Sequence, residues 1–192
     1  MVLGMGSASE DCKGRRPASP DGPILLGLGA NLPSPKYGPP VATLEASFEA
    51  LESRGLRLRS RSRWWESEPV PRADQPWYVN GVAEIATSLG PEELLAQLHE
   101  VEAEFGRARS LPNAPRILDL DLLAYGSILR PGPKPPLLPH PRLAERGFVL
   151  HPLAEIRPDW RHPETHRSLA EMIAALPRDQ IVRPLPHFPT SY

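Results

Sequence analysis

The sequence predicts an α+β fold, and three observations support this class. Apolar residues recur at helical spacing in two segments, 41–52 and 91–106. Shorter segments around them are continuously apolar or alternate between apolar and polar residues, which is typical of strands. Proline accounts for 26 of the 192 residues, whereas average usage is about 5%. So many residues that interrupt helices exclude an all-helical bundle.

The first part of the chain predicts a strand, a helix and a second strand. Residues 24–28 are continuously apolar and predict a buried strand that ends in a turn at 29–31. Residues 41–52 predict the first helix. Residues 56–64 alternate as a half-exposed strand does, and a proline-rich loop is expected over 65–76.

The next part completes a recognisable order of elements. Residues 77–89 predict a strand, residues 91–106 a helix that starts at proline and ends at glycine, and residues 117–125 another strand. The resulting order, βαββαβ, is the ferredoxin-like arrangement, an α/β sandwich in which helices cover one face of an antiparallel sheet. Additional C-terminal helices and a strand are expected near 143–156, 168–176 and 180–183.

Composition predicts one domain after an N-terminal leader. Residues 1–22 lack apolar periodicity and are expected to be disordered, and residues 23–192 to form a single domain. The 22 basic and 23 acidic residues give a net charge of −1, which argues against binding nucleic acid or membrane by bulk charge. The single cysteine, Cys12, excludes an intramolecular disulfide and a cysteine-based zinc site. We expect a cytoplasmic monomer.

Asp119 and Asp121 are the strongest chemical signal. Residues two apart on a strand point to the same face, so these carboxylates are expected roughly 6 to 7 Å apart, with leucines on the opposite face. Carboxylates this close repel each other unless a cation lies between them, and Mg²⁺ prefers such oxygen ligands. Taken alone, such a pair is more often a solvated strand face.

The loop before this strand strengthens the signal. Residues 106–118 contain no acid and three arginines, Arg107, Arg109 and Arg116. Guanidinium groups are planar, permanently charged and well suited to phosphate oxygens. A basic loop that leads into paired carboxylates is the arrangement that phosphoryl transfer needs. An ordinary exposed basic loop is the alternative interpretation.

Together these residues resemble the signature of the 6-hydroxymethyl-7,8-dihydropterin pyrophosphokinase family. The most specific block is Arg107-Ala-Arg109 followed by the sequence PRILDLD, which ends at Asp121. The flanking pieces occur in the family's order, namely LGAN at 28–31, DQPWYVN at 74–80, LPHP at 138–141 and RGF at 146–148. The resemblance covers roughly residues 23–159.

The resemblance implies an activity and a metal site. Members of this family have a similar fold and transfer pyrophosphate from ATP to the hydroxymethyl group of the pterin, with release of AMP and the use of two Mg²⁺ ions. Carried over by motif, Asp119 and Asp121 would hold both metal ions. Arg107 and Arg116 would bind the phosphates and stabilise charge during the transfer.

The resemblance also implies two groups of substrate-binding residues. Those for ATP are His99, Glu102, Arg109, Leu122, His140 and Arg146. Those for the pterin are Ser67, Val70, Tyr78, Asn80 and Phe148, where the two aromatic rings pack on the pterin and Asn80 bonds to its edge. Three loops, at 32–40, 65–76 and 107–115, are expected to close over the substrates and exclude water.

The chain departs from the family pattern at three places. Ala30 replaces a usual serine, and His99 stands where many members have glutamine. Asn113 and Ala114 precede Pro115, where some members have a tryptophan that covers the pterin. The candidates to replace that cover are Trp64, Trp65 and Trp77.

Two other interpretations of the sequence remain open. One is another two-metal nucleotidyl or phosphoryl transferase, because ferredoxin-like palms also use paired aspartates. The other is a non-catalytic module that binds nucleic acid or a small ligand. The second is disfavoured by the near-neutral charge and by the lack of a run of stacking aromatic residues.

Overall fold

The computed structural model describes residues 21–69, 74–106 and 115–186. Several sequence predictions concern residues outside these ranges, namely those for the leader over 1–20, for Val70, and for Arg107 and Arg109 in the basic loop.

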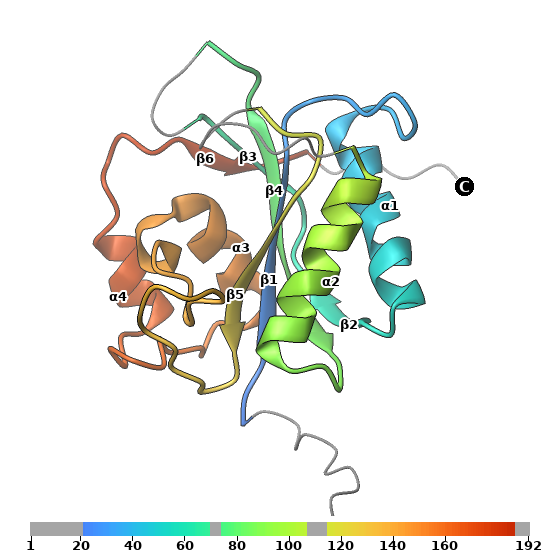
Figure 1. Ribbon diagram of the computed structural model, residues 1–192. Coiled ribbons are helices and arrows are strands. Elements are labelled where there is room, and N and C mark those ends of the chain that lie inside the picture. The colour runs from blue at the N-terminus through green and yellow to red at the C-terminus, as the bar shows by residue number, and fades with distance from the viewer. Residues whose placement is uncertain (1–20, 70–73, 107–114, 187–192) are drawn as a thin grey trace, which may run out of the picture.

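A central antiparallel sheet organises the molecule, with six strands in the described ranges (Figure 1). The strand order is β5 (Asp119–Tyr125), β1 (Ile24–Ala30), β4 (Tyr78–Ala86), β3 (Trp65–Ser67) and β6 (Val182–Pro184). The remaining strand, β2 (Arg57–Arg61), pairs with the second half of β4. The inner order β5-β1-β4-β2 is that of the ferredoxin-like fold, so the predicted class is confirmed.

Helices cover both faces of this sheet (Figure 1). One layer is formed by α1 (Pro40–Ser53) and α2 (Pro91–Glu104), and the opposite layer by α3 (Gly147–Ile156) and α4 (Leu169–Ala174). The two helices of the predicted βαββαβ core therefore lie on one face, as expected, and the additional C-terminal helices cover the other face. The reason lies in β1, where Leu26 packs in the first core and Leu25 in the second, both fully buried. Burying such a side chain contributes about 1.5 to 3 kcal/mol, which requires a cover on each face.

Both long helices begin at proline and end next to glycine. Pro40 and Pro91 are the first helical residues, where the missing N–H costs no hydrogen bond. Gly55 and Gly106 follow the C-terminal caps with φ of 76° and 88°, which glycine adopts without steric cost. The predicted helix ends are thus confirmed. No helix in the described ranges is both long and apolar enough to cross a membrane.

The proline-rich loop expected over 65–76 contains a strand. Residues 65–67 form β3, which pairs with the first half of β4 and, on its other side, with β6. Residues 62–64 separate β3 from β2, and the Ser62 hydroxyl accepts a hydrogen bond from the Val82 backbone N–H at 3.1 Å. Three residues are too few for a periodic signal, so this strand depends on partners that are distant in sequence.

The turn predicted at residues 29–31 was also wrong in part. β1 runs to Ala30, so Gly29 is a strand residue, and only Asn31 follows the strand. Leu26, Leu28 and Ala30 point toward the first helical layer. Gly27 and Gly29 therefore lie on the face that α3 and α4 cover.

Candidate active site

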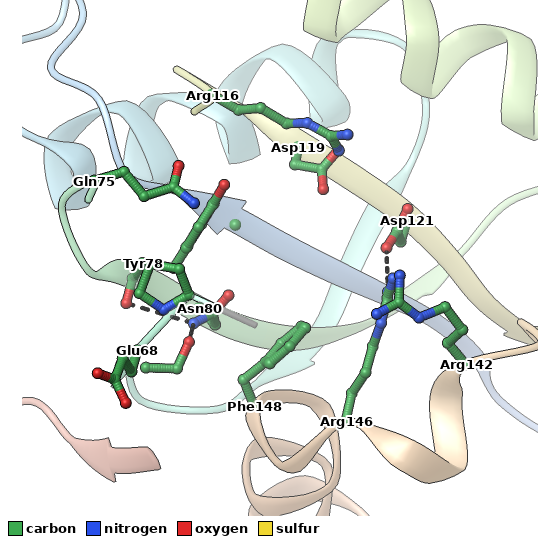
Figure 2. A pocket seen from close by; sticks show the side chains of 13 residues that line it. Glu68, Gln75, Tyr78, Asn80, Arg116, Asp119, Asp121, Arg142, Arg146 and Phe148 are labelled. Carbon is green, nitrogen blue, oxygen red and sulfur yellow. Dashed lines mark hydrogen bonds and ion pairs between the residues drawn. The ribbon is translucent and has the colours of Figure 1, made fainter. Parts of the chain in front are cut away.

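A cavity of about 360 Å³ opens on the sheet face that carries α3 (Figure 2). Most of the predicted site residues in the described ranges line it. Its lining residues are Gly29, Ser67, Glu68, Pro69, Gln75, Tyr78, Asn80, Arg116, Asp119, Asp121, Arg142, Arg146 and Phe148. Residues separated by more than 100 positions in sequence therefore share one site.

The space at the centre of this cavity exists because β1 has no side chain there. A Cβ atom at Gly29 would lie 3.4 Å from Asn80 Oδ1 and 3.9 Å from Asp119 Cβ. Any larger side chain would occupy the space between the polar groups of β4 and the acidic groups of β5. The sequence interpretation treated Gly29 as a turn residue and so missed this role. The sequence feature that could have indicated this role of Gly29 was the alternation of glycine and leucine along a buried strand.

Asp119 and Asp121 both face the cavity, as their spacing predicted. Leu120 and Leu122 are buried in the core on the opposite face. Each aspartate forms an ion pair with an arginine. Asp119 pairs with Arg116, three residues earlier, and Asp121 Oδ2 lies 2.9 Å from Nη1 of Arg146, which precedes α3 (Figure 2).

This pair of carboxylates suits a hard divalent cation. Mg²⁺ is commonly held by one or two carboxylates, with water and phosphate oxygens completing its coordination. The described ranges contain no cluster of three or more histidine, cysteine or acidic residues that would form a metal cage. Each aspartate already forms an ion pair with an arginine that lines the cavity. Their donor set therefore fits a metal that is shared with a phosphate ligand.

Asn31 holds Arg116 in place and ties three segments together. Asn31 is buried, and its Oδ1 accepts a hydrogen bond from the Arg116 backbone N–H at 2.7 Å. Its own backbone N–H donates to the Arg116 carbonyl at 3.0 Å, and its Nδ2 donates to the Pro76 carbonyl at 3.0 Å. From the sequence we interpreted this position only as part of a turn. The one sequence feature that could have indicated its role was a single polar residue directly after a buried strand.

The charge of Arg116 is secured by its surroundings. Burial acts to lower its pKa, but the nearby Asp119 and Asp121 carboxylates outweigh burial and raise the pKa above the ordinary value. The guanidinium group therefore remains charged, as a group that binds phosphate must be.

The opposite wall of the cavity is aromatic and amide in character. Asn80 and Ser67 are 5% and 3% exposed, and Asn80 Nδ2 donates to Ser67 Oγ at 2.9 Å. Burial raises the pKa of Tyr78, although Arg116 acts to lower it, so its phenol stays neutral. Phe148, at the start of α3, projects into the cavity beside Asn80 and Arg146 (Figure 2). This wall can receive a flat heterocycle with polar edges.

His140 lies next to the cavity without lining it. Its backbone N–H donates to the Leu123 carbonyl at 2.8 Å, and its Nδ1 accepts from the Arg142 backbone N–H at 3.1 Å. Burial lowers its pKa, with Arg146 and Arg142 acting in the same direction and Asp121 against it. The imidazole is therefore neutral at physiological pH.

The other residues predicted to contact ATP do not line the cavity. Glu102 is only 2% exposed, and its Oε1 accepts from the Leu120 backbone N–H at 2.7 Å. The side chain of Leu122 is buried in the core, and His99 is exposed on α2. The side chains of Glu102 and Leu122 thus lie on the opposite side of β5 from the cavity, and the predicted roles of both residues in binding ATP stay predictions.

The three tryptophans proposed as a cover lie elsewhere. Trp64 stacks on Phe48 in the first core, with ring centroids 6.0 Å apart. Trp65 stacks on His151 at 5.4 Å, and Trp77 lies under the Arg183 guanidinium at 5.0 Å. None of the three is among the cavity-lining residues of the described ranges.

Comparison with known proteins gives one consistent result. A sequence model described as 7,8-dihydro-6-hydroxymethylpterin-pyrophosphokinase matches residues 25–158. A 2-amino-4-hydroxy-6-hydroxymethyldihydropteridine pyrophosphokinase from Pseudomonas aeruginosa is 40% identical over 161 residues, covering 83% of this chain and 95% of that protein. The protein of the same name from Synechocystis is 38% identical over 151 residues, covering 78% and 73%.

Longer proteins also contain a similar segment. The folic acid synthesis protein of Pneumocystis carinii is 36% identical over 147 residues, which are 77% of this chain and 19% of that protein. A crystal structure of Plasmodium falciparum HPPK-DHPS matches with a TM-score of 0.60 and 12% identity, covering 79% of this chain and 44% of that one. At this identity the structural match supports the fold alone.

Proposed function

The chain belongs to the 7,8-dihydro-6-hydroxymethylpterin-pyrophosphokinase family, and from this premise we propose how its cavity carries out the family's reaction. The enzyme transfers pyrophosphate from ATP to 6-hydroxymethyl-7,8-dihydropterin in folate synthesis. One observation carries our assignment of the site. An acidic, arginine-paired wall and an aromatic–amide wall face each other across a single cavity.

The pterin binds against the aromatic–amide wall in this proposal. The Asn80 amide donates to Ser67, which orients it so that Oδ1 is available to N–H groups on the edge of the pterin. Phe148 and Tyr78 pack on the faces of the ring, where each aromatic contact adds to simple burial. Val70, outside the described ranges, contributes a backbone group by the family pattern.

The triphosphate of ATP lies along the acidic wall. Asp119 and Asp121 would hold two Mg²⁺ ions, which when bound neutralise charge on the phosphates. Arg116 and Arg146 line the same cavity and can bind phosphate oxygens. Arg107 and Arg109, outside the described ranges, belong to the basic loop that adds further positive charge.

The reaction needs positioning and charge neutralisation, and no covalent enzyme intermediate. The pterin hydroxyl oxygen attacks the β-phosphorus of ATP and forms a new P–O bond. The bond between that phosphorus and the oxygen shared with the α-phosphate breaks, AMP leaves, and the hydroxyl proton passes to solvent. Arginine side chains stabilise the phosphate charge during this transfer.

The remaining predicted residues have less direct roles. His140, neutral because of burial, is a hydrogen-bonding partner for the nucleotide. Leu122 lies on β5, the outermost strand at this edge of the sheet, so it would contact ATP through its backbone groups. Glu102 acts on β5 by holding the N–H of Leu120, the residue between the two aspartates. His99, exposed on α2, stays a predicted contact for ATP.

The direct test is release of AMP from ATP and Mg²⁺, with and without 6-hydroxymethyl-7,8-dihydropterin. We expect AMP only when both the metal and the pterin are present. AMP formation independent of the pterin, or none under any condition, would overturn the proposal. Omitting Mg²⁺ while keeping both substrates tests the metal separately.

We further propose that residues 23–192 act as one domain and that the enzyme is a cytoplasmic monomer. The participation of β6 in the same sheet as β1 supports the single domain. Light scattering coupled to size exclusion tests the oligomeric state, because a dimer would elute with twice the mass of the chain.

A further inference from the structure

A C-terminal segment, residues 177–184, bridges the two sides of the aromatic–amide wall, and we refer to it as the C-terminal strap. On one side its β6 pairs with β3, where Val182 lies opposite Ser67. The Glu68 backbone N–H also donates to the Ile181 carbonyl at 3.2 Å. Ser67 and Glu68 both line the cavity, so the strap supports this side directly.

On the other side, the strap contacts the first turn of α3 through Gln180. Gln180 Oε1 accepts a hydrogen bond from the Gly147 backbone N–H at 2.8 Å. Gln180 Nε2 donates to the Glu145 carbonyl at 2.7 Å. These two bonds fix the backbone on both sides of Arg146, and Phe148 follows directly. The Arg146 side chain provides no cap of its own to the helix, so Gln180 supplies the cap from a distant segment.

The strap and Leu176, the residue directly before it, pack closely against this turn. A Cβ atom at Gly147 would lie 3.1 Å from Gln180 Oε1 and 3.3 Å from side-chain atoms of both Leu176 and Val182. These distances leave no room for α3 to move toward the strap. The position of Phe148 is therefore coupled, through the strap, to the position of β3.

We infer that Gln180 is a positioning residue for the pterin site. It does not line the cavity, but it holds Phe148 and Arg146 at a fixed separation from Ser67 and Asn80. That separation sets the width of the slot into which a flat ring must fit. This inference rests on the proposed function, and it concerns a segment that lies beyond the residues matched by the family model, 25–158.

Two substitutions separate positioning from general stability. Gln180→Leu keeps the approximate size of the side chain and removes both hydrogen bonds. Gln180→Glu keeps an acceptor for the Gly147 N–H but loses the donor to Glu145. Gln97→Leu is the matched control, because Gln97 on α2 bonds to Glu100 of its own helix and lies outside the cavity.

The measurement is the steady-state KM for each substrate, together with kcat and Tm, on the full chain. We expect Gln180→Leu to raise the pterin KM about tenfold and the ATP KM much less, because Phe148 contacts the pterin directly whereas Arg146 is one of several cationic groups on the phosphates. The pterin KM of Gln180→Glu should lie between those of Gln180→Leu and the wild type, and the pterin KM of Gln97→Leu should equal that of the wild type. An unchanged pterin KM in Gln180→Leu overturns the inference. Equal increases in both KM values with a lowered Tm also overturn it, because they indicate general destabilisation.

If Gln180→Leu fails to fold, Gln180→Glu decides by the same criterion. A selective increase in its pterin KM supports the inference, and an unchanged value overturns it. Failure of the proposed function is distinguishable, since the wild type would then show no pterin-dependent AMP release and both proposals would be overturned. A wild type that is active and equalled by both variants overturns the role of Gln180 alone.

Discussion

Each aspartate of the cavity has an arginine partner from a different part of the chain. Arg116 reaches Asp119 from the preceding loop, whereas Arg146 reaches Asp121 from the start of α3. Each pair therefore places a positive charge beside one of two carboxylates that lie on the same face of the sheet.

Replacing either carboxylate should abolish turnover without unfolding the protein. We expect Asp119→Ala and Asp121→Ala each to lower kcat by at least about 10³-fold, because a principal electrostatic element of the transfer is removed. AMP release measures the rate, and circular dichroism with Tm measures folding. Asp159→Ala, at an exposed position outside the cavity, is the control. Near-normal rates in either cavity variant would contradict the metal assignment.

We expect the amide of Asn80 to determine the affinity for the pterin and to have no effect on the affinity for ATP. Asn80→Ala removes a polar group oriented by Ser67, so we expect pterin affinity to fall about tenfold or more while ATP affinity is retained. Calorimetry with each ligand measures both. Loss of ATP binding with normal pterin binding would move the pterin site elsewhere in the molecule.

At the scale of elements, β5 depends on a carboxylate beneath it. Glu102 of α2 accepts the backbone N–H of Leu120, midway between the two aspartates. This bond fixes the strand that carries both acidic groups. A buried N–H without an acceptor costs about 1 to 3 kcal/mol, so the contact matters to stability as well as to the site.

Two substitutions of Glu102 distinguish support of β5 from contact with ATP. Glu102→Ala removes the acceptor, and we expect a loss of about 1 to 3 kcal/mol in the free energy of unfolding and a lowered kcat. Glu102→Gln keeps an oxygen acceptor and should retain most of both. Urea denaturation and AMP release are the measurements. Equal loss of activity in both variants at full stability would indicate direct contact with ATP.

Contacts with other segments hold both ends of α3 in place. Arg157, which follows α3, forms a two-pronged contact with the buried Glu84 of β4, at 2.6 and 2.5 Å. Gln180 holds the beginning of the same helix. Fixing both ends of α3 on the sheet determines where Phe148 lies above the cavity floor.

At the scale of the whole molecule, a half-buried histidine, His151, and a buried one, His162, link stability to pH. Burial lowers the pKa of His151 and of His162 below the ordinary value of 6.5. Below about pH 6.5 the unfolded chain therefore takes up protons that the folded protein resists. The free energy of unfolding should fall as the pH drops from about 7 to about 5, and it should be regained on return to neutral pH.

A variant at His151 tests this dependence. His151→Phe keeps an aromatic ring against Trp65 but cannot bind a proton. We expect its Tm to decline less steeply than that of the wild type between about pH 7 and about pH 5. Parallel declines would show that His151 does not contribute.

Features that depend on neighbouring residues could be predicted from the sequence, whereas features that depend on residues distant in sequence could not. Helix ends at Gly55 and Gly106 and the alternation around Asp119 and Asp121 were predictable, because each depends on neighbouring residues. The short strand β3, the floor formed by Gly29 and the burial of Glu102 were missed. Their roles depend on partners 11 or more positions away, which no local pattern shows.

The sequence by itself determined the family, the ferredoxin-like order and the acidic pair, since motifs, periodicity and strand alternation are local properties of the chain. Only the tertiary structure decided which residues meet. The second helical layer, the Arg146–Asp121 pair and the Gln180 cap on α3 join segments 25 or more residues apart. Such contacts exist because folding buries both faces of β1 at once, and that burial brings the far segments to a single cavity.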